Sequence, residues 1–220
     1  MNHKPIHVIG AGLAGSEATW QIVKYGIPVI LHEMRPVKSS AAHKTNYFAE
    51  LVCSNSLRAG NIENAVGLLK EEMRRLGSLI MQQADAHQVP AGGALAVDRE
   101  GFAASITEIV TNHPLVTVVH EEVTDLASLE GTVIVASGPL TSDALFANIK
   151  EMLQEDYFYF FDGHTSLEEN FFFEVFDRSK LCSFQSFPKG KVFFLSFKGA
   201  VQIVCISFVV TGSTVNLVVV

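Results

Sequence analysis

The stretch that decides the fold runs from Ile6 to Gly15 and is IHVIGAGLAG. Its first four residues predict a short β-strand, and Gly10, Gly12 and Gly15 then follow with the spacing G-x-G-x-x-G. In a dinucleotide-binding βαβ unit, the first of these glycines permits a tight turn and the second lets the backbone approach a pyrophosphate. The third allows close packing of helix on strand. The stretch therefore predicts a phosphate-binding loop.

The residues after this loop have the order that a βαβ unit requires. Residues 14–25 predict a helix, whose N-terminus offers N–H donors and a positive dipole end to phosphates. Residues 28–33 predict the second strand, which ends at Glu33. A carboxylate at this place can accept both ribose hydroxyls of an adenosine, and it disfavours the 2′-phosphate of NADP. The residues expected to contact the nucleotide are Gly10, Ala11, Gly12, Leu13, Ala14, Gly15 and Glu33.

A later strand bears on the choice between FAD and NAD. Residues 132–136 form an uninterrupted apolar run, typical of a buried parallel strand, that ends in Ser137-Gly138-Pro139. Flavoproteins often close the FAD site with a strand that ends in such a turn, so FAD is favoured and Gly138 joins the expected contacts. Two alternatives stay open: an ordinary buried strand that ends in Gly-Pro, and a glycine-rich turn that binds nothing.

The first 155 residues alternate between apolar strand-like runs and amphipathic helical runs. This alternation predicts an α/β fold, a Rossmann-like FAD-binding domain with a mostly parallel sheet that is incomplete at its C-terminal end. Asp98 is the expected N-cap of one helix. Beyond the βαβ unit we expect strands at 94–97, 115–120 and 132–136, helices at 63–87, 99–112 and 141–153, and a polar connection with a short helix at 34–60.

Composition narrows the class of protein. The chain has 220 residues, of which 48% are hydrophobic, and a formal net charge of −7, which argues against a surface that coats nucleic acid. A local basic patch would still leave room for an RNA partner. Three scattered cysteines and eight histidines show no metal-ligand spacing, so no metal site is expected. The N-terminus lacks the apolar stretch of a signal peptide, which predicts a cytoplasmic protein.

The connection at 34–60 carries four cations and one acid, Glu50. It follows the strand end with Glu33, so it lies at the carboxyl edge of the sheet, where ligands bind in such folds. Within it, Cys53 stands among short polar side chains, and nearby cations would lower the pKa of its thiol and favour the thiolate. Cys53 is therefore the candidate catalytic residue. An inert buried cysteine is the alternative.

The last part of the chain, 156–220, differs in character. Ten of the 16 phenylalanines fall after residue 162, and no charged residue follows Lys198. The uncharged run at 199–220 is long enough for a membrane span. Its polar breaks and β-branched residues favour strands instead, so no membrane association is expected. We assign no function to this part.

Five segments of the chain form a recognisable set. They are VIGAGLAG at 8–15, HEMRP at 32–36, LVCSNSLR at 51–58, GGALAVDR at 92–99 and ASGPLTS at 136–142. Together they resemble one family, the folate- and FAD-dependent tRNA (uracil-5-)-methyltransferases, also called TrmFO or Gid. Asp156 to Asp162 (DYFYFFD) is similar to the same family, and the resemblance covers about the first three quarters of the chain.

The resemblance implies a bacterial enzyme that methylates a uridine at C5 in the T loop of tRNA. Methylenetetrahydrofolate would supply the carbon, and FAD reduced by NADH or NADPH would carry and reduce it. Cys53 would act at the uracil and the flavin, either by adding to uracil C6 or by protecting a flavin-linked intermediate. Arg99 has two interpretations, a flavin contact or a surface arginine.

Two departures from the family keep other interpretations open. Family members are considerably longer, and from about residue 163 the chain resembles nothing in the family. The missing part of the family pattern carries a second functional cysteine, which Cys182 and Cys205 are not expected to replace. The alternatives are a catalytically incompetent nucleotide-binding fragment and a related GidA-type tRNA-modifying flavoprotein.

Overall fold

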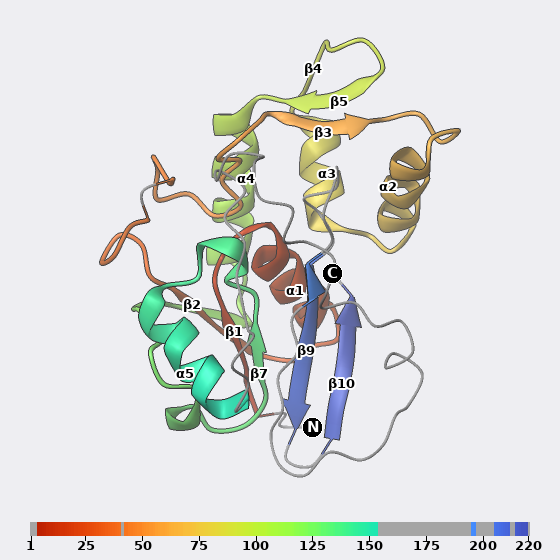
Figure 1. Ribbon diagram of the computed structural model, residues 1–220. Coiled ribbons are helices and arrows are strands. Elements are labelled where there is room, and N and C mark those ends of the chain that lie inside the picture. The colour runs from red at the N-terminus through yellow and green to blue at the C-terminus, as the bar shows by residue number, and fades with distance from the viewer. Residues whose placement is uncertain (1–3, 41, 154–194, 197–204, 212–213, 220) are drawn as a thin grey trace, which may run out of the picture.

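The computed structural model describes residues 4–40, 42–153, 195–196, 205–211 and 214–219 (Figure 1). These residues form two sheets. The larger sheet has the strand order β10-β9-β7-β1-β2-β6, with β8 paired to β9, and the smaller has the order β3-β5-β4.

Four parallel strands make the part of the larger sheet that was predicted. The central strand β1 pairs in parallel with β2 on one side and β7 on the other, and β2 pairs in parallel with β6. Each strand lies within one residue of its expected bounds, so the prediction of an α/β, Rossmann-like fold with a parallel sheet is confirmed. The strands are β1 (Ile6–Ile9), β2 (Val29–Glu33), β6 (Val116–His120) and β7 (Val133–Val135).

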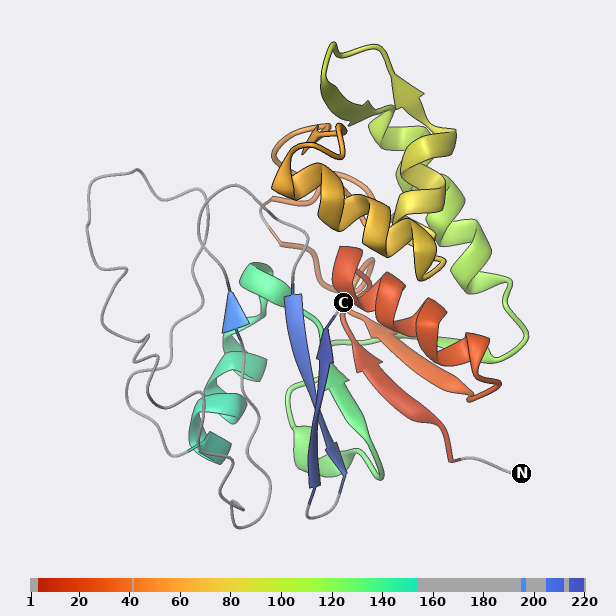
Figure 2. The ribbon, with the colours of Figure 1, turned by 90° about the vertical axis from the view of Figure 1, so that its right-hand side faces the viewer.

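Helices cover both faces of this sheet because successive side chains of a strand point to opposite faces. Val8 of β1 belongs to one core, which also contains residues of the helices on that face. Ile9 belongs to a second core with Leu145 and Ile149 of the last helix. Figure 2 shows α1 and α5 on opposite sides of the sheet. The helices are α1 (Leu13–Lys24), α4 (Arg99–Thr111) and α5 (Asp143–Leu153), with short 3₁₀ turns η1 (Leu126–Ser128) and η2 (Gly138–Leu140).

The described part of the C-terminal region is β-structure, as expected from its β-branched residues. Strand β9 pairs antiparallel with β7, and β8 and β10 pair antiparallel with β9. Among the described residues, no helix is both long enough and apolar enough to cross a membrane. The strands are β8 (Leu195–Ser196), β9 (Cys205–Thr211) and β10 (Thr214–Val219).

The prediction of a single helix at 63–87 is wrong, because this segment forms two helices. Gly77 has a left-handed φ of 69°, and the amides of Gly77 and Ser78 bond carbonyls in the last turn of the first helix. This is the glycine C-cap that ends many helices. The Ser78 hydroxyl then caps the second helix. The helices are α2 (Ala65–Arg75) and α3 (Leu79–Ala86).

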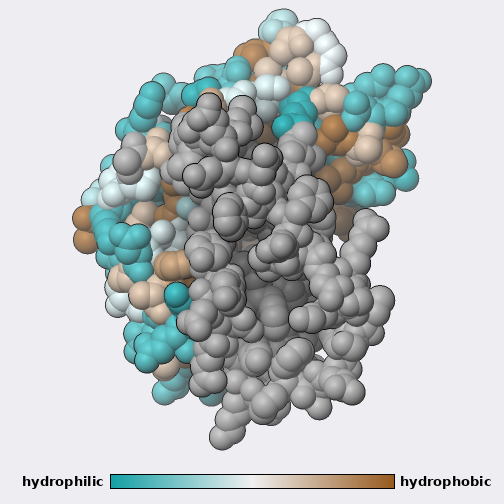
Figure 3. All heavy atoms as spheres, in the orientation of Figure 1, coloured by the Kyte–Doolittle hydropathy of each residue, from teal (hydrophilic) through white to brown (hydrophobic). Residues whose placement is uncertain are grey.

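The connection at 34–60 also differs from the expectation. Its described residues, 34–40 and 42–60, form turns and one strand but no helix. That strand, β3 (Ser56–Ala59), pairs antiparallel with β5 (Ala94–Val97), which pairs with β4 (Gln88–Val89). The small sheet was not predicted as a sheet. In Figure 3 the surface over α2, next to this sheet, mixes hydrophilic and hydrophobic residues.

Candidate functional site

The phosphate loop is held in its shape by backbone contacts that exclude side chains. Gly10 has a φ of 95°, and its amide donates to the carbonyl of His32 at 2.8 Å. A Cβ on Gly15 would lie 1.7 Å from the carbonyl oxygen of Gly10. Helix α1 therefore packs directly on the turn that precedes it, and glycine is required at position 15 on steric grounds.

The other side of this loop is open. Gly12 is the N-cap of α1, no side chain caps that helix, and its first turn carries no acidic residue. A Cβ on Gly12 would meet no heavy atom of the described residues within 4 Å. Amides at a helix N-terminus attract anions through their N–H groups and the helix dipole. The residues of the loop therefore fit the pyrophosphate of a dinucleotide, and the space a Cβ would fill is available to it.

The end of β7 lies beside this loop. The amide of Ala136 donates to the carbonyl of Ile9 at 2.8 Å. A Cβ on Gly10 would lie 2.8 Å from the Cα of Ser137. Gly138 has a φ of 64°, and a Cβ there would meet no atom within 4 Å in the part of the chain that the structure describes. The structure thus brings the glycine loop and Gly138 to the same edge of the sheet.

Glu33 faces the phosphate loop from the end of β2. Its Oε2 accepts the amide of Ala11 at 2.9 Å, and its Oε1 accepts the amide and the Nε of Arg35 at 3.0 and 2.8 Å. A carboxylate has about four acceptor positions, so Oε2 keeps one for a ligand hydroxyl. Burial alone would raise the pKa of Glu33, but the bonds and charge of Arg35 and the Ala11 amide outweigh it and lower the pKa. Glu33 is therefore ionised at neutral pH.

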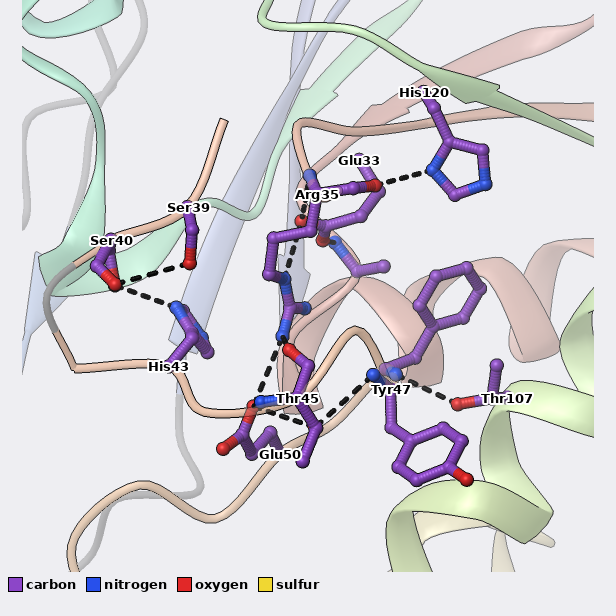
Figure 4. Close-up of polar contacts among 12 residues, drawn as sticks. Glu33, Arg35, Ser39, Ser40, His43, Thr45, Tyr47, Glu50, Thr107 and His120 are labelled. Carbon is purple, nitrogen blue, oxygen red and sulfur yellow. Dashed lines mark hydrogen bonds and ion pairs between the residues drawn. The ribbon is translucent and has the colours of Figure 1, made fainter. Parts of the chain in front are cut away.

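Sequence reasoning missed the role of Arg35. It was one of four cations in a segment expected to face a ligand, but its side chain is 2% exposed. The guanidinium bonds Glu33, the carbonyl of Thr45 and the carboxylate of Glu50, the last through Nη1 at 3.4 Å (Figure 4). A glutamate two residues before an arginine was the available signal, but the partner at Glu50 depends on how an irregular loop folds back.

Glu50 organises the loop on the other side of Arg35. Its Oε1 accepts the amide of Lys44 at 2.9 Å, and its Oε2 accepts the amide and hydroxyl of Thr45 at 3.1 and 2.9 Å. Burial would raise the pKa of Glu50, but these bonds and the charge of His43 lower it. The carboxylate of Glu50 thus accepts from backbone amides that, in a helix or strand, would bond a backbone carbonyl.

Cys53 is exposed, which differs from the alternative of an inert buried cysteine. Its backbone carbonyl accepts a hydrogen bond from Nη2 of Arg99 at 3.3 Å. Arg99 is exposed at the start of α4, and this contact is one that neither interpretation of Arg99 included. Two of the four cations of the connection are bound elsewhere, since Arg35 pairs with Glu33 and Glu50, and Lys38 pairs with Glu122.

A second group of polar residues lies on the α5 side of the sheet, and none of it was singled out from the sequence. His7 Nδ1 lies 2.9 Å from His32 Nε2, and His32 Nδ1 lies 2.8 Å from a carboxylate oxygen of Glu121. Burial, followed by the neighbouring His32, lowers the pKa of His7. Within the part of the chain that the structure describes, no three His, Cys, Asp or Glu residues are arranged to hold a metal ion.

Known proteins match the part of the chain that contains this site. The pattern of the family described as Glucose inhibited division protein A matches residues 5–170. The methylenetetrahydrofolate–tRNA-(uracil-5-)-methyltransferase TrmFO of Heliobacterium modesticaldum is 64% identical over 158 residues, which are 72% of this chain and 36% of the relative. The enzyme of the same name from Bacillus subtilis is 55% identical over 196 residues, 89% of this chain and 44% of the relative.

Two further facts define the extent of these matches. The chain spans less than half the length of either relative. The expectation that the resemblance ends at about residue 163 is wrong, because the family pattern extends to residue 170 and the Bacillus subtilis relative matches 196 of the 220 residues. The division of the chain at 155 stays a prediction. The structure of Aquifex aeolicus GidA in its form II crystal matches 56% of this chain and 20% of that protein, with a TM-score of 0.44 and 18% identity.

Proposed function

Since the chain belongs to the Glucose inhibited division protein A family, we propose that it binds FAD and serves the folate-dependent methylation of uracil C5 in tRNA. The reaction is the one in the names of its relatives. The substrates would be methylenetetrahydrofolate and a T-loop uridine, and the reductant NADH or NADPH. We place the reaction in the cytoplasm.

The observation that carries the cofactor proposal is the open N-terminus of α1 beside an ionised Glu33. The amides of residues 12–15 would hold the pyrophosphate, and Oε2 of Glu33 would accept a ribose hydroxyl. Gly138, with open space at its Cα, would let the cofactor approach the end of β7. Reduced FAD would supply the electrons that convert the one-carbon unit of methylenetetrahydrofolate to a methyl group.

Cys53 is the proposed nucleophile toward the RNA. A thiolate that adds to C6 of uracil turns C5 into a carbon nucleophile, and the thiolate leaves again when the C5 proton is removed. The exposure of Cys53 supports this role because a base in RNA must reach the sulfur. Arg99 would fix the backbone at Cys53 by its bond to the carbonyl of that residue.

Two assays on the purified chain test this proposal. We expect a flavin absorption spectrum that is released on denaturation. We also expect transfer of labelled carbon from methylenetetrahydrofolate to T-loop uridine, measured by mass spectrometry of digested tRNA. Cys53→Ala should abolish the transfer and keep the flavin, and Cys182→Ala is the matched control that should keep both. A colourless wild-type protein would contradict the cofactor proposal, and bound flavin without transfer would favour the catalytically incompetent alternative.

A further inference from the structure

Five residues around Arg35 form a closed ring of contacts. Oε2 of Glu33 accepts the amide of Ala11, and the carbonyl of Ala11 accepts the amide of Ala49 at 2.9 Å. Ala49 is bonded covalently to Glu50, Glu50 pairs with Nη1 of Arg35, and Nε of Arg35 returns to Glu33. We call these five residues the Arg35 ring; Figure 4 shows its Glu33, Arg35 and Glu50 side chains.

The Arg35 ring joins two parts of the site that have different tasks. Ala11 belongs to the phosphate loop, and Glu33 is the carboxylate proposed to bind ribose. Glu50 folds the turn at 44–50 and stands three residues before Cys53. A shift of Glu33 or Ala11 on nucleotide binding therefore reaches the segment with Cys53 by two routes, the guanidinium of Arg35 and the backbone bond between Ala11 and Ala49.

Burial makes this connection rigid. The side chains of Arg35, Glu33 and Glu50 are 2%, 5% and 11% exposed. Water competes little for ion pairs at such exposure, and an arginine fork can bond two carboxylates at fixed angles. Lys38, from the same loop, pairs with Glu122 on the surface instead, with its side chain 47% exposed.

We infer that Arg35 is a positioning residue that couples occupancy of the nucleotide site to the order of residues 44–53, which carry Cys53. The inference rests on the proposed function, since it requires a nucleotide at the phosphate loop. Its consequence is that the adenosine half of FAD alone, without a flavin ring near Cys53, stabilises this segment. A ligand that stabilises the closed form of a segment slows its opening in proportion to its binding.

Hydrogen exchange of the peptide at 44–53, with and without saturating ADP, tests the inference. The amides of Lys44, Thr45 and Ala49 report on it because all three bond within or beside the Arg35 ring. In wild type, ADP should slow this exchange about threefold or more. Lys38→Met, the matched control, should show the same protection. In Arg35→Met the protection should fall below about twofold although calorimetry shows ADP bound.

A second variant covers the case in which Arg35→Met does not fold. Glu50→Leu keeps the pair of Arg35 with Glu33 and leaves no acceptor at the other end of the ring, and the amide of Ala49 should lose its ADP-dependent protection as well. Equal protection by ADP in wild type and in the folded ring variants would overturn the inference. A purely structural role of Arg35 predicts that exchange in the variants is faster than in wild type by the same factor with and without ADP. That result would also overturn the inference.

Failure of the proposed function has a separate signature. If wild type binds neither ADP nor FAD in calorimetry, the cofactor proposal falls and the coupling falls with it. If both ligands bind and ADP leaves the exchange of the peptide at 44–53 unchanged in wild type, the cofactor proposal stands and the coupling alone is wrong.

Discussion

The phosphate loop at 10–15 and the connection at 34–60 lie on two sides of one site and are held by different forces. The loop depends on backbone groups packed so closely that Gly10 and Gly15 have no room for a Cβ. The connection has irregular backbone whose amides are satisfied by side chains, above all Glu50. A substitution that adds a Cβ should therefore destabilise the phosphate loop, whereas a substitution that removes a charge should destabilise the connection.

The largest effect is expected from Gly15→Ala. The new Cβ would lie 1.7 Å from the Gly10 carbonyl oxygen, so α1 must move away from the loop. We expect a loss of more than about 4 kcal/mol in the free energy of unfolding, or no folded protein. Urea denaturation measures it. Gly12→Ala, where the Cβ meets open space, should cost less than about 1 kcal/mol. Similar costs at both positions would contradict the steric account of the loop.

Arg35→Met tests the other side of the comparison. It leaves the buried carboxylate of Glu33 and the part-buried carboxylate of Glu50 without their cation. Breaking a buried ion pair from one side costs about 3 kcal/mol or more. Lys38→Met removes an exposed pair and should cost less than about 1 kcal/mol in the same urea titration. Equal stability of Arg35→Met and Lys38→Met would contradict the claim that the ion pairs of Arg35 stabilise the connection.

Acid should weaken the connection through Glu33. Its pKa is lower in the folded protein than in the unfolded chain, so the unfolded chain takes up a proton first as pH falls. The stabilisation by Glu33 is complete above the ordinary glutamate pKa of about 4.3 and is lost below it. The free energy of unfolding, measured between pH 6 and 3, should fall for wild type and fall less steeply for Glu33→Gln. Parallel curves would contradict the ionised state assigned to Glu33.

The smallest effect concerns Lys70, which holds the far end of the connection. Its ammonium is buried and donates to the carbonyls of Ala59 and Val66 at 3.1 and 3.2 Å. Burial, followed by the charges of Arg74 and Arg58, lowers the pKa of Lys70. The folded protein therefore releases this proton before the unfolded chain does. The free energy of unfolding of wild type should therefore rise from pH 8 to pH 10 relative to that of Lys70→Met. At pH 7 the variant, which lacks the two hydrogen bonds of the ammonium, should be less stable than wild type by about 1 kcal/mol.

The βαβ unit could be predicted because its signals are local. Within 28 residues, apolar spacing and the three glycines of the G-x-G-x-x-G motif predict the strands at 6–9 and 29–33 and the helix at 13–24. The small sheet could not be predicted in this way. Its strands have two to four residues, and Ser56 pairs with Ala96, so neither its length nor its register leaves a local pattern.

The helix break at 76–78 was present in the sequence as Gly77 followed by Ser78, a C-cap glycine and an N-cap serine. The regular apolar spacing on both sides concealed it. Contacts from α1 help to set the break, since Glu17 accepts from the Ser78 hydroxyl and Lys24 donates to the carbonyl of Leu76. Such contacts between segments more than 50 residues apart depend on the fold itself.

The central claim is that the open N-terminus of α1 binds the phosphates of a dinucleotide. Calorimetric titration of FAD into wild type and Gly12→Asp tests it most directly, because Gly12 is an N-cap with extended backbone where aspartate is well accepted. The account predicts an unchanged or raised unfolding midpoint and an FAD affinity lower by about 100-fold, since the new carboxylate repels the pyrophosphate. Equal affinity of the two proteins for FAD would contradict it.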